Sequence, residues 1–365
     1  MKLVGGSVFG ADHRMHVCDL SFENGVITAD SAGDTLDVSG CYVLPGLIDT
    51  HIHGARGVCF YWSDDDLTPA LDWLASRGVT GILPTTGSAT VEELEHDVKR
   101  LVSLNDDRIL GVHAEGPFLN PINKGGMRLN RIHAPSCEML ERMYLASDGK
   151  LKILTLAPEM EGADEVIALC NSLGIKVSMG HTSADYDTAK RAVDLGASRV
   201  THTYNAMPGL KHRDPGILGL ALDDDRVTCE LICDTLHVSG PAMRIVIRAK
   251  GAERVTAISD ASSFAGLPDG EYFQNDRTIY AKNGLTTLAD GTITGSTLCL
   301  ADGAKNLFDM GFSPAEVALM TSTNPAAAAG CTDRGELIPG YRADVVVFDP
   351  DFHVRAVFLA GERIK

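Results

Sequence analysis

Short apolar runs recur about every 30 residues from residue 44 onward, and each is followed by a segment with helical periodicity. The eight runs are VLPGLID, VTGILPT, RILGVHAEG, LKILTLAPE, IKVSMGHT, RVTHTYNAM, VTCELICD and VTAISDA. Between them apolar residues fall three and four positions apart, as from Val91 to Val102, and Ser239 with Pro241 opens another helix. Eight parallel strands joined by crossover helices close into a barrel, so the pattern predicts an α/β fold of the (β/α)8 TIM type.

The two ends of the chain have a different pattern. Residues 1–43 and 334–365 contain short strands and turns, including an Asn24-Gly25 hairpin signal and the alternating run ADVVVFD. We expect these ends to pair as a small β domain, with the barrel domain occupying residues 44–333. A stretch near 266–294, rich in Gly, Asp and Asn, predicts a β-rich insertion between the eighth strand and a helix beginning near Ser296.

Polar residues with metal-ligand or proton-transfer chemistry follow several of the apolar runs. They are His51 and His53 after the first run, Glu115 after the third, His181 after the fifth, His202 after the sixth and Asp260 after the eighth. In a barrel the carboxyl ends of the strands surround one mouth, where active sites form. We therefore expect these six side chains to meet near the barrel axis.

Each of these residues also has an ordinary structural explanation. Glu115 could cap a loop, Asp260 could cap a helix, and an isolated His-x-His pair is more often a pair of satisfied polar residues in a loop. His113 lies two residues before Glu115, so its role is ambiguous. The joint placement of all six residues at the same end of the strands favours a shared site.

The residue types indicate metal-assisted hydrolysis. Imidazoles and a carboxylate can hold a divalent ion with an open position, and such an ion lowers the pKa of bound water toward ~7 and polarises a carbonyl. Asp260 could take the proton of the water and deliver it to a leaving amine. The predicted substrate class is an amide, and the ligands suit zinc, iron, manganese or cobalt.

Charge and composition limit the classes of partner that we expect the protein to bind. The 32 basic and 49 acidic residues give a formal charge of −17, which argues against a nucleic acid or an anionic membrane surface. No signal peptide is visible and no apolar run reaches the ~18 residues of a bilayer span, so we expect a cytoplasmic protein. The nine cysteines are scattered without a C-x-x-C pair and are expected to be reduced core residues.

A set of short motifs covers nearly the whole chain: LPGLIDTHIHG, HAEGPFLNP, LAPE, GHTSA, THTYNAM, DTLHV, SDA, GSTL and GYRADVVVFD. Together they resemble the amidohydrolase superfamily and, within it, the N-acetylglucosamine-6-phosphate deacetylases. The resemblance implies removal of the N-acetyl group from an amino sugar phosphate with release of acetate. It also implies one or two divalent ions per chain, zinc foremost, and a homodimer in which the neighbouring subunit can complete the phosphate pocket.

The resemblance assigns roles residue by residue. It places His51 and His53 at one metal site, and Glu115, His181 and His202 at another, with Glu115 as the bridge. Asp260 matches the catalytic acid and base and is counted among the metal ligands. The matches to sugar phosphate contacts are Asn205, Ala206, Arg213 and His237.

The chain departs from the family pattern in the loop after EGPF. Where relatives place a histidine that helps to polarise the acetamide carbonyl, this chain has Met127, and a thioether cannot donate a hydrogen bond. Nearby candidates for that contribution are Arg128, Arg131 and His133. The aromatic residues Phe60 to Trp62 are expected to pack the loop, with stacking on a sugar face as the alternative.

Three other functions stay open on the sequence. The first is deacetylation of another N-acetyl hexosamine, such as N-acetylgalactosamine 6-phosphate or an unphosphorylated sugar. The second is a cyclic amidase, although these enzymes often bridge two metals with a lysine ending the fourth strand. Here that strand ends in Thr155-Leu156-Ala157, and Lys152 lies at its beginning. The third is a metal-free barrel that acts as a binding or assembly protein.

Overall fold

Eight parallel strands form one sheet in the computed structural model, which describes residues 1–365. The sheet order is β15-β14-β13-β12-β11-β10-β9-β6. The strands are β6 Leu47–Ile52, β9 Val79–Thr86, β10 Val112–Glu115, β11 Leu151–Leu156, β12 Lys176–Met179, β13 Arg199–Val200, β14 Thr228–Ile232 and β15 Val255–Ile258. Each of the eight predicted runs overlaps one of them, and the predicted (β/α)8 barrel is confirmed.

The first and last strands close the sheet into a barrel. Ile52 at the end of β6 pairs in parallel with Ala261, just after β15. The backbone N–H of His53 donates to the carbonyl of Ala261 (2.8 Å), and the N–H of Asp260 donates to the carbonyl of His51 (2.9 Å). Two distant parts of the sequence, both carrying predicted site residues, therefore meet at this seam.

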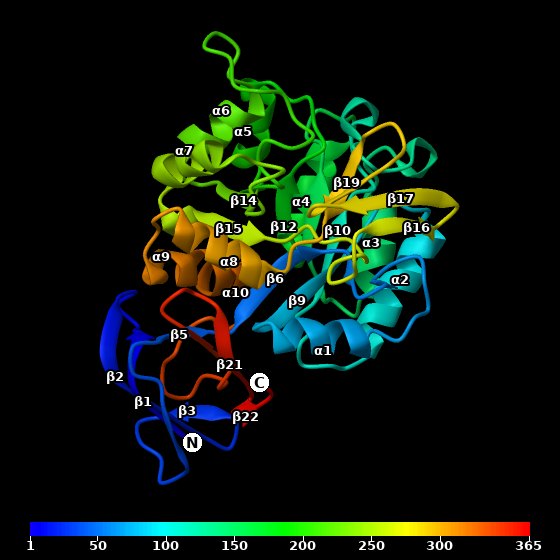
Figure 1. Cartoon of the computed structure of the whole chain (residues 1–365). Coiled ribbons are helices and arrows are strands. Elements are labelled where there is room, and N and C mark those ends of the chain that lie inside the picture. Colours follow the sequence, from blue (N-terminus) through cyan, green and yellow to red (C-terminus); the bar gives the residue numbers. More distant parts are fainter.

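Helices cover the outside of the barrel (Figure 1). They are α1 Thr68–Ser76, α2 Val91–Ser103, α3 Cys137–Ala146, α4 Ala163–Leu173, α5 Tyr186–Asp194, α6 Gly216–Asp223, α7 Gly240–Lys250, α8 Leu300–Asp309, α9 Pro314–Ala318 and α10 Asn324–Ala329. The predicted helix of Val91 to Val102 is α2, which begins with a capping box between Thr90 and Glu93. The helix expected near Ser296 begins only at Leu300, because the chain up to Ser296 is still a strand.

Both chain ends form the predicted small β domain, where the two termini lie (Figure 1). Its strands are β1 Lys2–Phe9, β2 Met15–Glu23, β3 Val26–Thr28, β4 Thr35–Asp37, β5 Tyr42–Pro45, β20 Val345–Phe348, β21 Val354–Leu359 and β22 Glu362–Arg363. The Asn24-Gly25 turn between β2 and β3 has positive φ at both residues (50° and 81°), as a tight hairpin requires. A separate apolar cluster, with Phe22 and Phe358 edge to face at 5.1 Å, holds this domain together.

The first apolar run is divided between the two parts of the fold. β5 pairs with β20 in the small sheet up to Pro45, two residues beyond the expected boundary, and β6 starts the barrel at Leu47. Gly46 between them packs so closely on Thr80 that any Cβ there would overlap that side chain. A glycine therefore marks the passage from one sheet to the other.

The stretch predicted as an insertion contains a four-stranded antiparallel sheet, β16 Gly270–Gln274, β17 Arg277–Lys282, β18 Leu285–Thr287 and β19 Ile293–Ser296. Ser296 pairs with Ala261, so the insertion ends beside the barrel seam. A short hairpin, β7 Gly54–Ala55 and β8 Val58–Cys59, follows β6. None of the helices combines the length and the apolar composition needed to cross a membrane.

Candidate metal centre

The predicted site residues of β6 point into the barrel mouth together. His51 is fully buried and His53 is 8% exposed, and residues two apart on a strand share a face. The Nε2 atom of His51 lies 3.3 Å from Oε1 of Glu115, and the Nε2 atom of His53 lies 3.3 Å from Oε2. The His-x-His pair therefore faces a carboxylate that comes from the third barrel strand.

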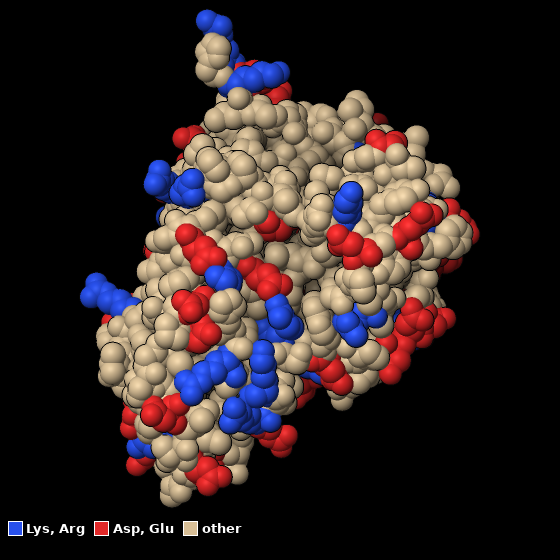
Figure 2. Space-filling model, viewed as in Figure 1, with Lys and Arg blue, Asp and Glu red and all other residues tan.

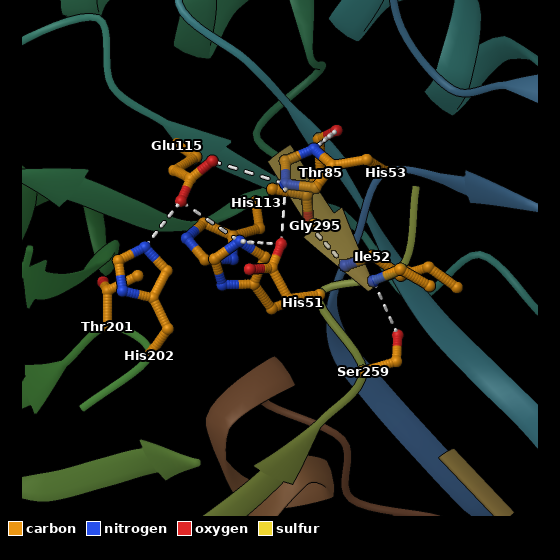
Figure 3. Close-up of polar contacts among 12 residues, drawn as sticks. His51, Ile52, His53, Thr85, His113, Glu115, Thr201, His202, Ser259 and Gly295 are labelled. Carbon is orange, nitrogen blue, oxygen red and sulfur yellow. Dashed lines mark hydrogen bonds and ion pairs between the residues drawn. The ribbon is translucent and has the colours of Figure 1, made fainter. Parts of the chain in front are cut away.

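Glu115, His181 and His202 converge from three further strand ends, and Figure 3 shows Glu115 and His202 facing each other. Oε1 of Glu115 lies 3.1 Å from Nε2 of His181 and 3.1 Å from Nε2 of His202. The two imidazole nitrogens are 3.0 Å apart. These potential ligand atoms all lie within 4.8 Å of one another, which is close enough for them to share one ion.

Asp260 joins the first pair. Its Oδ1 atom lies 3.3 Å from Nε2 of His53 and 3.7 Å from Nε2 of His51, and these three residues form a second compact ligand group. Oε1 of Glu115 faces His181 and His202 and also lies 3.3 Å from Nε2 of His51, whereas Oε2 faces His53. All six residues expected to meet thus do meet, with Glu115 between the two groups.

The ring orientations suit metal ligation. Nδ1 of His53 faces the carbonyl of Thr85 (3.1 Å), and Nδ1 of His181 faces the carbonyl of Asn123 (2.8 Å). A carbonyl only accepts, so it fixes the proton on Nδ1 and leaves the Nε2 lone pair free. Nε2 of His51 is buried without a hydrogen-bond partner. The donor set therefore fits one or two divalent ions.

Three of the site residues have an unusual backbone conformation. The φ angles of His181, His202 and Asp260 are 49°, 29° and 47°, in the left-handed region that non-glycine residues rarely occupy. Each residue follows the end of a barrel strand, where this conformation turns the chain sharply. Strain of this kind persists where the surrounding fold imposes it, and it is concentrated at functional sites.

Charge and burial act strongly on this cluster. Burial raises the pKa of the Glu115 carboxyl, but the charge of His51 and hydrogen bonds from His181 and His202 hold that pKa well below its usual value. Burial lowers the pKa of His53, but hydrogen bonds with Asp260 and Glu115 raise it to about 9. Glu115 is therefore a carboxylate at neutral pH, and without an ion His53 carries a second proton, on Nε2, which an ion would displace.

The predicted substrate contacts are divided by the structure. Asn205, Ala206 and His237 line the same cavity as His53, Glu115 and Asp260. Arg213 does not: it lies in the exposed loop of residues 209–214. That loop, before α6, projects from the body and carries basic side chains at its tip (Figures 1 and 2). In a single copy of the chain Arg213 therefore does not line this cavity, and its contact with the phosphate stays a prediction.

The loop around Met127 forms part of the cavity wall. Met127 and Arg128 line the cavity, whereas Arg131 pairs with Glu93 and His133 lies outside it. Of the three candidates to replace the missing histidine, Arg128 alone reaches the cavity. Its guanidinium carbon lies 5.9 Å from the ring centroid of Trp62.

The aromatic loop after the His-x-His pair has two roles. Phe60 is fully buried in the main apolar cluster, as expected for packing. Tyr61 and Trp62 instead line the cavity. Their rings lie 4.3 Å apart between centroids with their planes tilted by 58°, and they form an angled aromatic wall beside the candidate ligands.

The sequence analysis did not place the insertion at the site, yet Gln274, Asn275 and Arg277 of the β16–β17 hairpin line the cavity. Arg277 donates to the carbonyl of Gly126 (2.8 Å), and Arg128 donates to the carbonyl of Asn275. The insertion and the Met127 loop are thus joined across the mouth. The signal available in the sequence was position, because a segment that follows the eighth strand starts at the mouth.

The ambiguity of His113 is also resolved. Its Nδ1 atom lies 2.9 Å from the carbonyl of Thr50, and its Nε2 atom lies 2.9 Å from the hydroxyl of Thr155. Burial and the neighbouring charge of His51 lower the pKa of His113 to about 3. Both nitrogens are therefore engaged, and this neutral residue supports the barrel interior beneath the site.

Comparison with known proteins agrees with this arrangement. The model of the amidohydrolase family matches residues 42–364. The chain belongs to the amidohydrolase family. This amidohydrolase is 33% identical to the N-acetylgalactosamine-6-phosphate deacetylase of Escherichia coli O157:H7 over 364 residues, 96% of this chain and 94% of the relative.

Further relatives extend the likeness of this amidohydrolase. It is 33% identical to the N-acetylglucosamine-6-phosphate deacetylase of Vibrio furnissii over 356 residues, 94% of this chain and 89% of that one. A crystallised variant of the Mycobacterium smegmatis N-acetyl-D-glucosamine-6-phosphate deacetylase, in complex with N-acetyl-D-glucosamine-6-phosphate, has a TM-score of 0.94 and 31% identity. The match covers 100% of this chain and 99% of that one.

Metal uptake by this amidohydrolase should increase with pH. A metal ligand must lose its proton, and the pKa of about 9 at His53 means that an ion displaces a proton from it at neutral pH. Affinity for Zn²⁺ should therefore rise about tenfold per pH unit for each proton released, up to pH 9. Competition titrations of metal-free protein from pH 6.5 to 8.5 measure this dependence. An affinity for Zn²⁺ that does not change across that range would contradict the prediction.

Proposed function

We propose that this protein is a metal-dependent amide hydrolase that removes the N-acetyl group from an amino sugar 6-phosphate. The preferred substrate in this proposal is N-acetylglucosamine 6-phosphate, and the products are glucosamine 6-phosphate and acetate. The carrying observation is the convergence of four imidazoles and two carboxylates at one barrel mouth, in a chain about one-third identical to such deacetylases.

The proposed metal centre has two parts. Glu115, His181 and His202 would hold one divalent ion, and His51, His53 and Asp260 would hold a second, with Glu115 facing both. Zinc is the proposed ion, since imidazoles and carboxylates are its ordinary ligands. When bound, such an ion supplies Lewis-acid chemistry, because it makes water more acidic and withdraws electrons from a carbonyl.

Asp260 is the proposed general base and general acid. Its side chain is 14% exposed, which leaves it open to the cavity, and burial raises its pKa while the charges of His51 and His53 lower it overall. It is therefore ionised at neutral pH. Its carboxylate would take the proton of the attacking water and deliver it to the leaving amine of the sugar.

His237 is prepared for a substrate contact. Its Nδ1 atom donates to Asp234, and its buried Nε2 atom has no partner within the protein. An unpaired polar atom that lines a cavity gains from a ligand that pairs with it. We propose that His237, with Asn205 and Ala206, contacts the phosphate end of the sugar.

The nature of the sugar is decided by experiment. One relative is named for N-acetylgalactosamine 6-phosphate and others for N-acetylglucosamine 6-phosphate, at equal identity. The cyclic amidase alternative is weaker, because Thr155 near the end of the fourth strand is hydrogen-bonded within the barrel and that end of the strand carries no lysine.

Acetate release should be greatest with N-acetylglucosamine 6-phosphate. The assay compares the glucosamine and galactosamine forms, each with and without the 6-phosphate, beside dihydroorotate as a cyclic amide. Loss of the phosphate should raise KM, because a charge-assisted contact is lost. Equal turnover of the unphosphorylated sugars would contradict the phosphate assignment, and hydrolysis of the cyclic amide alone would contradict the deacetylase assignment.

Asp260→Asn should lower kcat by roughly 100- to 10,000-fold, because the amide can neither take nor deliver the proton. The ion at Glu115, His181 and His202 should be retained, as elemental analysis would show. Asp344→Asn is the matched control, since Asp344 is a buried carboxylate beside β20 in the small β domain and does not line the cavity. Similar kcat values for the two variants would exclude Asp260 as the acid and base.

Arg213 would act in a homodimer, reaching the phosphate site of the second copy. Arg213→Ala should then raise KM for the phosphorylated substrate, whereas Lys211→Ala in the same exposed loop should change it little. When Asp260→Asn and Arg213→Ala chains are mixed, half of the dimers should be hybrids, and each hybrid should have one intact active site. The mixture should therefore regain about a quarter of the active sites of wild type. Failure of the mixture to exceed the separate variants would contradict the shared site.

A further inference from the structure

The seventh barrel strand carries a charged residue where a buried parallel strand is ordinarily apolar. Glu230 lies in the middle of β14, between Cys229 and Leu231, and its side chain is fully buried in the barrel interior. Burial of a carboxylate is costly unless hydrogen bonds compensate it. Glu230 therefore needs partners, and their identity indicates what it does.

The partners of Glu230 include two residues of the proposed metal centre. Its Oε2 atom accepts from Nδ1 of His51 (3.0 Å) and from the backbone N–H of His202 (3.4 Å). Its Oε1 atom accepts from Nη2 of Arg199 (3.3 Å). The carboxylate thus lies between a metal-site imidazole and a buried guanidinium.

We infer that Glu230 is a positioning residue for metal binding, which fixes the tautomer and orientation of His51. An imidazole that ligates an ion has lost its extra proton and is neutral, with one N–H and one lone pair. Because Glu230 accepts a hydrogen bond from Nδ1–H, the proton stays on Nδ1. The lone pair therefore lies on Nε2, which faces Glu115 and Asp260. This inference rests on the proposed metal centre and concerns its His51 group.

Two of the other three imidazoles of the site support this assignment, whereas Nδ1 of His202 has no partner. His53 and His181 use backbone carbonyls, of Thr85 and Asn123, for the same purpose. His51 uses a carboxylate, which holds the N–H more strongly than a neutral carbonyl does. Outer partners of this kind orient metal ligands, and their loss weakens metal affinity by about 10- to 100-fold.

A different reading would make His51, His113 and Glu230 a metal site of their own, since their ligand atoms are also close together. The hydrogen bonds argue against it. Both ring nitrogens of His113 are engaged, with Thr50 and Thr155. An ion there would have to break one of these contacts and also the hydrogen bond between His51 and Glu230, so the group is better explained as support for the mouth above it.

Arg199 makes a sharp test possible. A guanidinium is charged and only donates, so in Glu230→Gln the amide oxygen should turn toward Arg199 and the amide NH2 toward His51, at the expense of the long 3.4 Å contact from the backbone N–H of His202. The NH2 group would then donate to Nδ1, and the proton of the imidazole would move to Nε2, where the ion must bind. The isosteric variant should therefore abolish ligation by His51.

The experiment is titration of metal-free protein with Co²⁺, followed by its absorption spectrum and by elemental analysis. Wild type should bind two ions, and Glu230→Gln should bind one normally, with the second weakened by at least about tenfold. Adding Arg199→Met should restore the second ion, because the glutamine oxygen is then free to accept from His51. Arg199→Met with Glu230→Leu, which offers no acceptor, should again bind one ion.

Each outcome decides the inference. It is overturned if Glu230→Gln binds both ions as wild type does, if that variant loses both equally, or if the two double variants bind alike. The double variants remain diagnostic if Glu230→Gln is insoluble. In that single variant the buried guanidinium of Arg199 has lost its counter-charge, whereas both double variants lack the guanidinium. A wild type that binds a single ion would refute the His51 ion and this inference, while acetate release would still stand as evidence for the deacetylase.

Discussion

The closure of the barrel between its first and eighth strands is the constraint on which the site depends. Backbone hydrogen bonds join His51 to Asp260 and His53 to Ala261, although some two hundred residues separate the two segments. Because hydrogen-bonded backbones can shift little, these bonds fix the distance between the His-x-His pair and the carboxylate of Asp260. A metal site built from loops alone would lack that constraint, and its ligands would have to be ordered when the ion binds.

The sequence was sufficient to predict the barrel and the six converging side chains, because both depend on periodic signals. Parallel strands buried on both faces read as apolar runs, and the residue that follows each run lies at the mouth. His181 and His202 were found in this way without any knowledge of their backbone angles. The same logic predicted α2 from its apolar spacing and the β2–β3 turn from Asn24-Gly25.

What the sequence could not supply depends on long-range contacts that carry no local signal. Arg213 has the chemistry of a phosphate ligand, yet its loop extends away from the cavity of its own chain. Arg277 looks like an ordinary exposed strand residue, but the insertion returns it to the mouth beside Arg128. Glu230 was not identified because it lies inside an apolar run. Its apolar neighbours define the strand, and candidate site residues were sought only at the ends of the runs.

The interior beneath the site explains why such residues are tolerated there. His113 contacts Thr155, Thr155 contacts Thr201 (2.8 Å), and Thr201 donates to Ser178 (2.6 Å), so one hydrogen-bonded chain crosses four strands. A buried polar network of this kind stabilises one arrangement only if its members are paired. Because Thr155 is committed to this network, the fourth strand offers no side chain to the mouth, and the position between the two ligand groups is occupied by Glu115 from the third strand.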